Sequence, residues 1–304
     1  MKSEIPAGGV VVGTDGSAHA ELAVLWAAAQ AASEGRPLDL VHAYGVAGVG
    51  ELPWVGGPGL DRAVLAHAVR DSAASVLHDA QQLAEHRAPG VEVRTHALHS
   101  DAREALVTAS TTAHLLVVGS RGRGPWKRLV LGSVSSAVAR EAECPVVVCR
   151  PGHPQSTSAR VVVGVDGTPA CTPVLEFAFE QASRTGAPLT VTHTFKDLPG
   201  DEGPDEGHDG LAHAVLSLQD KYPDVAVDLR ADRGLVDECL SGSGPQGGLV
   251  VIGRRSPHGW GRLVEASNAL AVLEHATTTV VVVPENSSTD DASTPARPEE
   301  RNQS

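Results

Sequence analysis

The sequence predicts an α/β protein with two similar domains in tandem, each built on a parallel sheet with helices on both faces. Three observations support this fold class. Val10–Ser17 returns as Val161–Thr168, at an offset of 151 residues (161 minus 10). Short apolar runs alternate with helical patterns along each copy, as in chains of βαβ units. The apolar runs are continuous and rich in valine, which is typical of parallel strands buried on both faces.

The repeat extends through both halves of the chain. Gly35–Leu38 returns as Gly186–Leu189 at the same offset, and Trp126–Val130 returns as Trp260–Val264 at an offset of 134 residues (260 minus 126). The second copy is therefore 17 residues shorter (151 minus 134) between its second strand and its final loop. A duplication of a whole unit constrains the architecture more than a single motif does. The prediction of two domains therefore rests on this duplication.

Composition sets the expected boundaries. The chain of 304 residues is long enough for two ordinary domains. We predict one domain over residues 1–150 and a second over residues 159–285, with a short linker between them. Residues 286–304 are rich in Ser, Thr, Asp and Glu and are expected to be a disordered tail. Two glycine-rich segments, residues 45–59 and 197–210, are expected to be loops.

The first domain begins with a predicted strand over residues 9–14. Ser17 is placed to cap the helix that follows, and Gly35 is placed to end it. The helix carries an apolar stripe at positions i, i+3, i+4 and i+7, formed by Leu22, Leu25, Trp26 and Ala29. The remaining elements are strand 38–43, helix 61–88, strand 91–97, helix 101–112, strand 115–119, helix 133–141 and strand 146–149.

The second domain repeats this order. Thr168 is a predicted helix cap, and Pro169 stands at the first helical position, where proline is favoured. Gly186 repeats the stop signal before a strand over residues 189–194. The apolar stripe of its first helix is formed by Leu175, Ala178, Phe179 and Ala182.

Charge and composition exclude several classes of function. The formal charge of −13 argues against a protein that coats nucleic acid. No apolar run reaches the length of a membrane span, and the first residues lack the apolar region of a signal peptide, so we expect a cytoplasmic protein. The four cysteines form no C-x-x-C pair and have no zinc-site spacing, which favours buried thiols.

The most informative motif follows the fourth predicted strand. Gly119-Ser-Arg-Gly122 is followed, after nine residues, by Gly132-Ser133, where a helix is predicted to begin. Glycines at this spacing suit a backbone that approaches something closely, and free N–H groups at a helix N-terminus favour an anion. The motif therefore predicts a phosphate cradle. Arg121, Arg123, Lys127 and Arg128 make this segment basic, either to screen phosphate charge or as an ordinary solvated loop.

Asp15, two residues after Gly13, lies at the end of the first strand. By itself it is best explained as a turn residue before Gly16, but together with the phosphate motif it is a candidate ligand for a ribose or a base. Neither a Walker-type G-x-x-x-x-G-K-[ST] motif nor a G-x-G-x-x-G after the first strand is present, which disfavours P-loop NTPases and dinucleotide enzymes.

The phosphate motif resembles the nucleotide-binding signature of the universal stress proteins. The opening Gly-x-Asp-Gly-Ser, the pair His42-Ala43 and the closing Cys144–Val148 resemble that family as well, over residues 8–150 and 159–284. The resemblance implies two flavodoxin-like domains of the adenine nucleotide alpha hydrolase type, each with a five-stranded parallel sheet. It implies ATP, with or without Mg²⁺, with adenine near Asp15 and Ala43. The candidate binding residues are Gly13, Asp15, Ala43, Val118, Gly119, Arg121, Gly122, Gly132, Ser133, Val134 and Ser135.

The second copy departs from the signature. Gly253 is kept, but Ser256 and Ala266 replace the second and third glycines, and Glu265 adds a negative charge. Asn268 stands where the first copy has Val134. We therefore expect weak or absent ATP binding by the second domain.

Three functions were weighed. A nucleotide-binding stress or signalling module is favoured over a slow ATP hydrolase, because no general base, metal-binding carboxylate pair or other catalytic residue is evident. A flavin or redox carrier lacks a reactive cysteine pair. Single-domain members of the family associate as dimers, which implies that Val146–Cys149 pairs internally with residues 280–283. A homodimer through other surfaces remains open.

Overall fold

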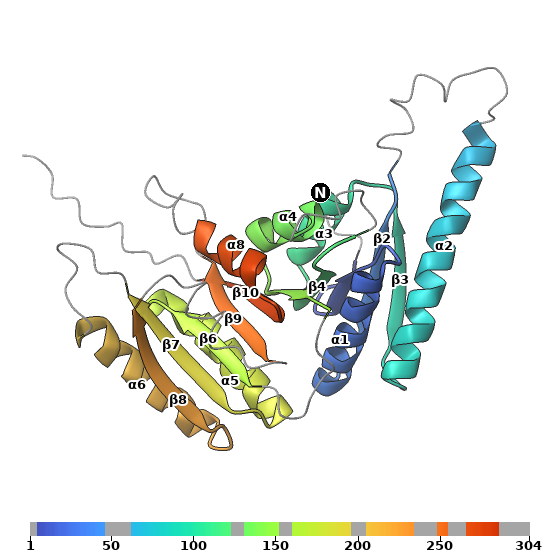
Figure 1. Ribbon diagram of the computed structural model, residues 1–304. Helices are drawn as coiled ribbons and strands as arrows, with labels where there is room; N and C mark the ends of the chain where they lie inside the picture. Colours follow the sequence, from blue (N-terminus) through green and yellow to red (C-terminus); the bar gives the residue numbers. More distant parts are fainter. Residues whose placement is uncertain are drawn as a thin grey trace, which may run out of the picture.

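The described part of the chain forms one continuous ten-stranded sheet (Figure 1). The computed structural model describes the following residues: 5–45, 62–122, 131–151, 160–195, 205–233, 248–254 and 266–285. The strand order is β3-β2-β1-β4-β5-β10-β9-β6-β7-β8, so the last strands of the two halves lie side by side at the centre.

The first half, up to residue 151, alternates strand and helix as predicted. Its elements are β1 Val10–Gly13, α1 Ala18–Glu34, β2 Leu38–Ala43, α2 Arg62–Arg87, β3 Val93–Leu98, α3 Ala102–Ser110, β4 Leu115–Gly119, α4 Ser133–Glu141 and β5 Val146–Cys149. The bounds of β2, β4, α4 and β5 match the predicted ranges, and the other bounds differ by one or two residues.

The second half, from residue 160, has β6 Val161–Val165, a 3₁₀ turn Pro169–Cys171, α5 Thr172–Thr185, β7 Leu189–Phe195, α6 Asp205–Lys221, β8 Val227–Arg233, β9 Leu249–Arg254, α8 Ala266–His275 and β10 Thr279–Pro284. The predicted helix start at Thr168 therefore needs correction. Thr168 makes no side-chain cap, and a 3₁₀ turn precedes the helix proper. Pro169 lacks an N–H and suits this first turn.

Within each half all strand pairs are parallel, and the first strand lies between the second and the fourth. This is the predicted doubly wound parallel sheet. The order 3-2-1-4-5 places the switch point between β1 and β4, whereas in flavodoxin itself the order is 2-1-3-4-5.

The two halves are joined by β5 and β10, which pair antiparallel. Val148 faces Val280, Val147 faces Val281 and Val146 faces Val282. The internal pairing of the last strands is thus the one expected from the duplication. Each strand covers the edge that the other would leave open.

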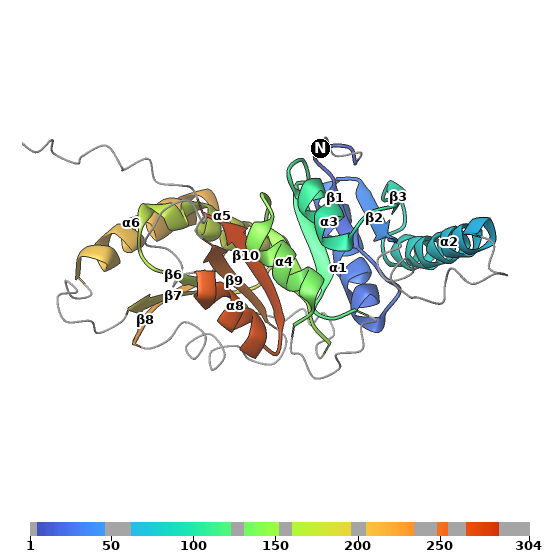
Figure 2. The same cartoon turned by 90° about the horizontal axis from the view of Figure 1, so that it is seen from above.

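Two aliphatic cores lie on opposite faces of the sheet, and both continue across the junction. One core lies under α1, α2, α5 and α6, and the other under α3, α4 and α8 (Figure 2). Val147 and Val281 belong to the first core, while Val146 and Val280 belong to the second. The two halves therefore share their apolar interior.

The predicted apolar stripe of α5 is confirmed, whereas that of α1 is confirmed only in part, since Leu22 and Trp26 pack against the core without being fully buried. Leu175, Ala178, Phe179 and Ala182 of α5 are all fully buried. In α1 the predicted residues Leu22, Leu25, Trp26 and Ala29 are only partly buried. The buried residues are instead mostly alanines: Ala20, Ala23, Val24, Ala27, Ala28, Gln30 and Ala31. Small side chains let the helix axis lie close to the sheet, so the bulky residues are displaced to its flanks.

The cap signals of α1 are confirmed. Ser17 accepts a hydrogen bond from the N–H of Ala20 (3.3 Å). Gly35 ends the helix in the left-handed region at φ +62°, and Gly186 ends α5 in the same way at φ +63°. The predicted loop 197–210 is wrong at its end, since residues 205–210 form the first part of α6. The structure does not describe most of the predicted linker, the tail 286–304, residues 46–59 and 197–204, or Arg123, Lys127, Arg128, Cys239, Ser256 and Glu265.

We predict that the isolated first half, cut after Pro151, self-associates in solution. Removal of β10 exposes Val146–Cys149 as an apolar sheet edge, and a second copy supplies the same valine sequence. Sedimentation velocity over a range of concentrations measures this association. In the full chain the amides of β5 should be strongly protected from hydrogen exchange. A half that stays monomeric at high concentration contradicts the prediction.

Candidate functional site

The candidate site lies at the carboxyl ends of β1 and β4. This is the switch point of the first half, where open α/β sheets hold ligands. Three segments meet there: the turn Gly13–Ser17, the stretch Gly119–Gly122 and the start of α4. All three contain residues that the sequence predicted, so the structure brings together the core of the predicted set.

The turn after β1 is organised by the Asp15 carboxylate. Its Oδ1 accepts a hydrogen bond from the N–H of Ser17 (3.0 Å), which is the turn role considered for this residue. Its Oδ2 lies against Gly122, where a Cβ would come within 2.5 Å of that oxygen. His42 Nδ1 lies 2.7 Å from the carbonyl oxygen of Thr14, so the imidazole donates and ties β2 to the turn. One carboxylate therefore links the turn after β1 to the glycine segment.

Ser120 joins the glycine segment to α4. Its carbonyl accepts hydrogen bonds from the N–H of Gly132 (2.8 Å) and from the hydroxyl of Ser135 (3.2 Å). Its own hydroxyl lies 2.9 Å from Nδ1 of His19, in the first turn of α1. Ser120 is 1% exposed. This one residue therefore holds together the starts of both helices that flank the site.

Sequence reasoning missed Ser120 and His19. Ser120 fills a variable position of the Gly-x-x-Gly motif, and His19 is one of 14 scattered histidines. A polar residue between the two glycines, with a histidine at the start of the first helix, was the available signal.

The start of α4 has no side-chain cap. Gly132 occupies the N-cap position in an extended conformation (φ −75°, ψ 158°) and offers no side chain to the N–H groups of the first turn. Ser133 is exposed and Val134 is partly buried, so these two predicted residues border solvent. Ser135 is buried and its hydroxyl is used within the protein. Free N–H groups at a helix start attract anions.

Gly119 is required by packing within the protein. A Cβ on Gly119 would lie 2.6 Å from the backbone carbonyl group of His19, so any side chain would push α1 away from β4. Val118 is buried, and a Cβ on Gly13 would lie 3.5 Å from its side chain. Ala43, partly buried at the end of β2, pairs in register with Leu98. The sequence predicted that the backbone at Gly119 lies close to another group, and in the structure that group is the backbone at the start of α1.

Basic groups set the electrostatics of the site. The pKa of His19 is lowered, first by its burial and then by the positive charges of Arg121 and Arg150, while Asp15 acts in the opposite direction. At pH 7 the His19 imidazole is therefore neutral. Arg121 is exposed at the mouth of the site. An anion placed there would be attracted by both arginines.

The equivalent region of the second half is filled differently. A Cβ on Gly253 would overlap the carboxylate of Glu285, which lies over the glycine that corresponds to Gly119. His193 repeats the contact of His42, with Nε2 3.2 Å from the carbonyl oxygen of Asp166. The contact of the histidine is thus retained, but a carboxylate occupies the space beside the end of β9, which disfavours phosphate there.

Other site types find no support in the described residues. No group of three or more His, Cys, Asp or Glu side chains there is arranged to hold a metal ion. No helix of the described ranges has the length and apolar character needed to cross a membrane. Cys144, Cys149 and Cys171 are buried free thiols, and burial raises the pKa of Cys144 to about 12. This suppresses thiolate chemistry at Cys144.

Fold and site define the class: a doubly wound α/β protein, duplicated within one chain, with a glycine-rich candidate ligand site at the switch point of its first half. The sequence model of the Universal stress protein family matches residues 8–150 and again residues 158–242. The chain belongs to the universal stress protein family.

Relatives of full length support this assignment. A universal stress protein of Mycolicibacterium smegmatis is 32% identical, over 90% of this chain and 96% of its own length. The universal stress protein Rv2623 of Mycobacterium tuberculosis is 34% identical, over 91% of this chain and 97% of its own. The crystal structure of a universal stress protein from Archaeoglobus fulgidus covers 92% of this chain and 97% of its own, with a TM-score of 0.66 at 18% identity. The duplicated fold is therefore shared with these proteins.

We predict that His19 titrates below its ordinary pKa of 6.5. Because the folded-state pKa is lowered, the unfolded chain binds the proton first, and His19 destabilises the fold as the pH falls below about 6.5. NMR titration of the imidazole measures the shift. The variant Arg121→Gln should raise the pKa of His19, since it removes one of the repelling charges. A pKa at or above 6.5 in the unaltered protein contradicts the prediction.

Proposed function

We propose that this protein binds an adenine nucleotide, ATP, at the switch point of its first half, and acts as a nucleotide-binding stress or signalling module. The observation that carries the proposal is the start of α4. Gly132 leaves the first N–H groups of the helix without a side-chain cap, next to the Gly119–Gly122 segment and two arginines. Phosphates satisfy such N–H groups and are favoured by the helix dipole.

The phosphate chain fits one side of the site. The N–H groups of Ser133 and Val134 and the exposed hydroxyl of Ser133 are the donors in reach of an anion outside α4. Ser135 is also a predicted binding residue. Its hydroxyl donates a hydrogen bond to the carbonyl oxygen of Ser120, so only its backbone N–H is available to a ligand. Arg121 supplies positive charge without a fixed geometry. Charge-assisted hydrogen bonds of this kind are the stronger ones in proteins.

The adenosine fits the other side of the site. Asp15 holds an acidic oxygen beside Gly122, where a ribose hydroxyl or a base amino group is a suitable donor. Ala43 and the backbone of Gly13 lie on neighbouring strands at the same sheet edge. The described residues offer no group of three metal ligands, so Mg²⁺ would be held by phosphate oxygens and water.

The second half is proposed to bind little or no nucleotide. Glu285 over Gly253 and the sequence changes Ala266 and Glu265 all oppose a phosphate there. A full chain should therefore take up one ATP.

The variant Gly132→Val tests the proposal. Its backbone conformation suits valine, so the fold should survive, but the side chain would crowd the gap between the start of α4 and the stretch Ser120–Arg121, where the phosphates are proposed to lie. Loss of two charge-assisted hydrogen bonds, each about 1.5–3 kcal/mol, weakens binding by about a hundredfold or more. Isothermal titration calorimetry with ATP should give one site in the unaltered chain and none in the variant.

Gly210→Val is the matched control, because a Cβ there meets nothing within 4 Å and the position is far along the chain from the site. It should bind ATP like the unaltered chain. Full-strength binding by Gly132→Val would show that α4 does not hold the phosphates.

The alternative, a slow ATP hydrolase, predicts measurable turnover. We expect phosphate release far below the roughly 1–10³ s⁻¹ typical of enzymes. Asp15 lies at the proposed adenosine end, and His19 Nδ1 is engaged by Ser120, so neither is placed as a general base for the γ-phosphate. A steady-state phosphate-release assay measures the rate. Rapid turnover that disappears in Gly132→Val would make the protein an enzyme.

A further inference from the structure

Arg254, at the end of β9 in the second half, reaches into the first half. Its Nη1 donates to the carbonyl oxygen of Arg140 (2.6 Å), and its Nη2 donates to that of Ala142. These two carbonyls end α4. Arg254 as a residue is 9% exposed, and burial lowers the pKa of its guanidinium. A buried cation needs such partners, and a positive charge at a helix C-terminus is favourable.

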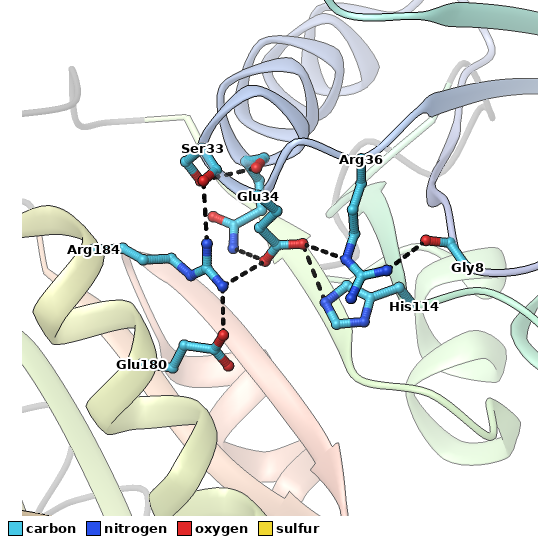
Figure 3. Close-up of polar contacts among 8 residues, drawn as sticks. Gly8, Ser33, Glu34, Arg36, His114, Glu180 and Arg184 are labelled. Carbon is cyan, nitrogen blue, oxygen red and sulfur yellow. Dashed lines mark hydrogen bonds and ion pairs between the residues drawn. The ribbon is translucent and has the colours of Figure 1, made fainter. Parts of the chain in front are cut away.

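Arg184, on α5 of the second half, makes an equivalent contact with α1. Its Nη1 donates to the carbonyl oxygen of Ser33 (3.3 Å), and its Nη2 lies 3.9 Å from Oε1 of Glu34 and also pairs with Glu180 (Figure 3). Ser33 and Glu34 end α1. The side chain of Glu34 is only 4% exposed.

The Glu34 carboxylate is held in its charged form by this cluster. His114 Nε2 lies 3.1 Å and Arg36 Nε 3.3 Å from its Oε2, as Figure 3 shows. Burial alone would raise the pKa of Glu34, but hydrogen bonding with His114 and Gln30 and the charges of His114 and Arg184 lower it overall. Arg184 therefore meets a fixed negative charge at the end of α1.

Both helices that end on these arginines begin at the candidate site. α1 starts directly after Ser17, and α4 starts directly after Gly132. At 1.5 Å per residue, α4 is about 14 Å long and α1 about 26 Å long. A helix transmits a displacement of one end to the other as a nearly rigid rod. The second half therefore contacts the C-terminal ends of α1 and α4, and the N-terminal ends of the same two helices border the candidate site.

The two arginines are specific to the second copy. At the repeat offsets, Arg254 corresponds to Ser120 and Arg184 corresponds to Ser33 (254 minus 134 and 184 minus 151). Among the described residues, the first half also contributes a contact of this kind: Arg150 donates to the carbonyl oxygen of Leu273 in α8. Arg150 does not correspond to Arg254 or Arg184 in the repeat. The position that organises the candidate site in the first copy has therefore become a contact between halves in the second.

We propose that Arg254 and Arg184 are positioning residues, through which the second half sets the nucleotide affinity of the first by fixing the C-terminal ends of α4 and α1. The proposal rests on the proposed function, since it concerns ATP at that site. By linkage, ATP bound in the first half must tighten the contact between the halves to the same extent.

Three variants of the full chain test this inference: Arg254→Met, Arg184→Met and the double variant. Changes within a coupling network shift affinity by about threefold to thirtyfold, and we expect each single variant to weaken ATP binding within this range. The two contacts lie on separate helices, so the effect of the double variant should be the product of the single effects. Calorimetry measures Kd, and thermal unfolding shows that the variants are folded.

Arg254→Lys separates positioning from charge. Lysine keeps the positive charge but replaces the two-pronged guanidinium by one ammonium group, so its Kd should fall between those of the unaltered chain and Arg254→Met. Arg160→Met is the matched control. It removes the same charge from the second half, but its bond to Thr190 (2.8 Å) stays within that half, so Kd should be unchanged.

Hydrogen exchange supplies a readout that a purely structural role would not move. Saturating ATP should slow exchange of the Val280–Val282 amides in the unaltered chain, and this effect should shrink in the double variant.

If the unaltered chain fails to bind ATP, both the proposed function and this inference are wrong. If it binds ATP and the folded arginine variants bind equally well, only this inference is overturned. Should Arg254→Met fail to fold, Arg184→Met, whose side chain is 26% exposed, decides alone.

Discussion

The antiparallel pairing of β5 with β10 is the interaction on which the rest of the structure depends. Two parallel sheets of five strands would each end in an edge of valines, and the unpaired N–H and C=O groups of such an edge are a template for association with other chains. Pairing the two edges with each other covers both of them in one step. Because successive valines point to opposite faces, the junction also contributes to both cores, so the halves cannot separate without opening the interior.

The junction explains why the duplicated halves have diverged. Once β5 and β10 hold the halves in a fixed orientation, residues near the junction face a constant partner and can specialise against it. Arg254 illustrates this: its equivalent Ser120 bonds within its own half, whereas Arg254 bonds to the end of α4. Glu285 illustrates the other side, since it covers Gly253 and leaves the second half less suited to phosphate. The carboxylate over Gly253 and the contact between halves thus involve neighbouring residues at one sheet end.

Most of the fold could be predicted because each strand is a short valine-rich run bounded by strong signals. Gly35 and Gly186 end their helices as expected, and the repeat, together with the family resemblance, indicated the pairing of β5 with β10. The predicted stripe of α1 missed the most buried face of the helix, because periodicity counts large side chains whereas close packing on the sheet selects alanine. Ser120 and His19 were not predicted as site residues, because their role depends on a contact between residues 101 positions apart in the chain. No local sequence pattern encodes such a contact.

The glycine motif of the candidate site has more than one physical cause. Gly119 is needed so that α1 can start against β4, and Gly122 so that the Asp15 carboxylate can lie beside the chain; both requirements hold with no ligand considered. Gly132 differs in degree, since its conformation is open to other residues and a Cβ there would lie 3.2 Å from Ser135 Oγ, 3.4 Å from Ser120 O and 3.6 Å from the Cα of Arg121. Packing therefore restricts Gly132 less severely than the other two glycines, and the helix start that it occupies has no side-chain cap. The phosphate argument therefore rests on Gly132, while the other two glycines build the frame around it.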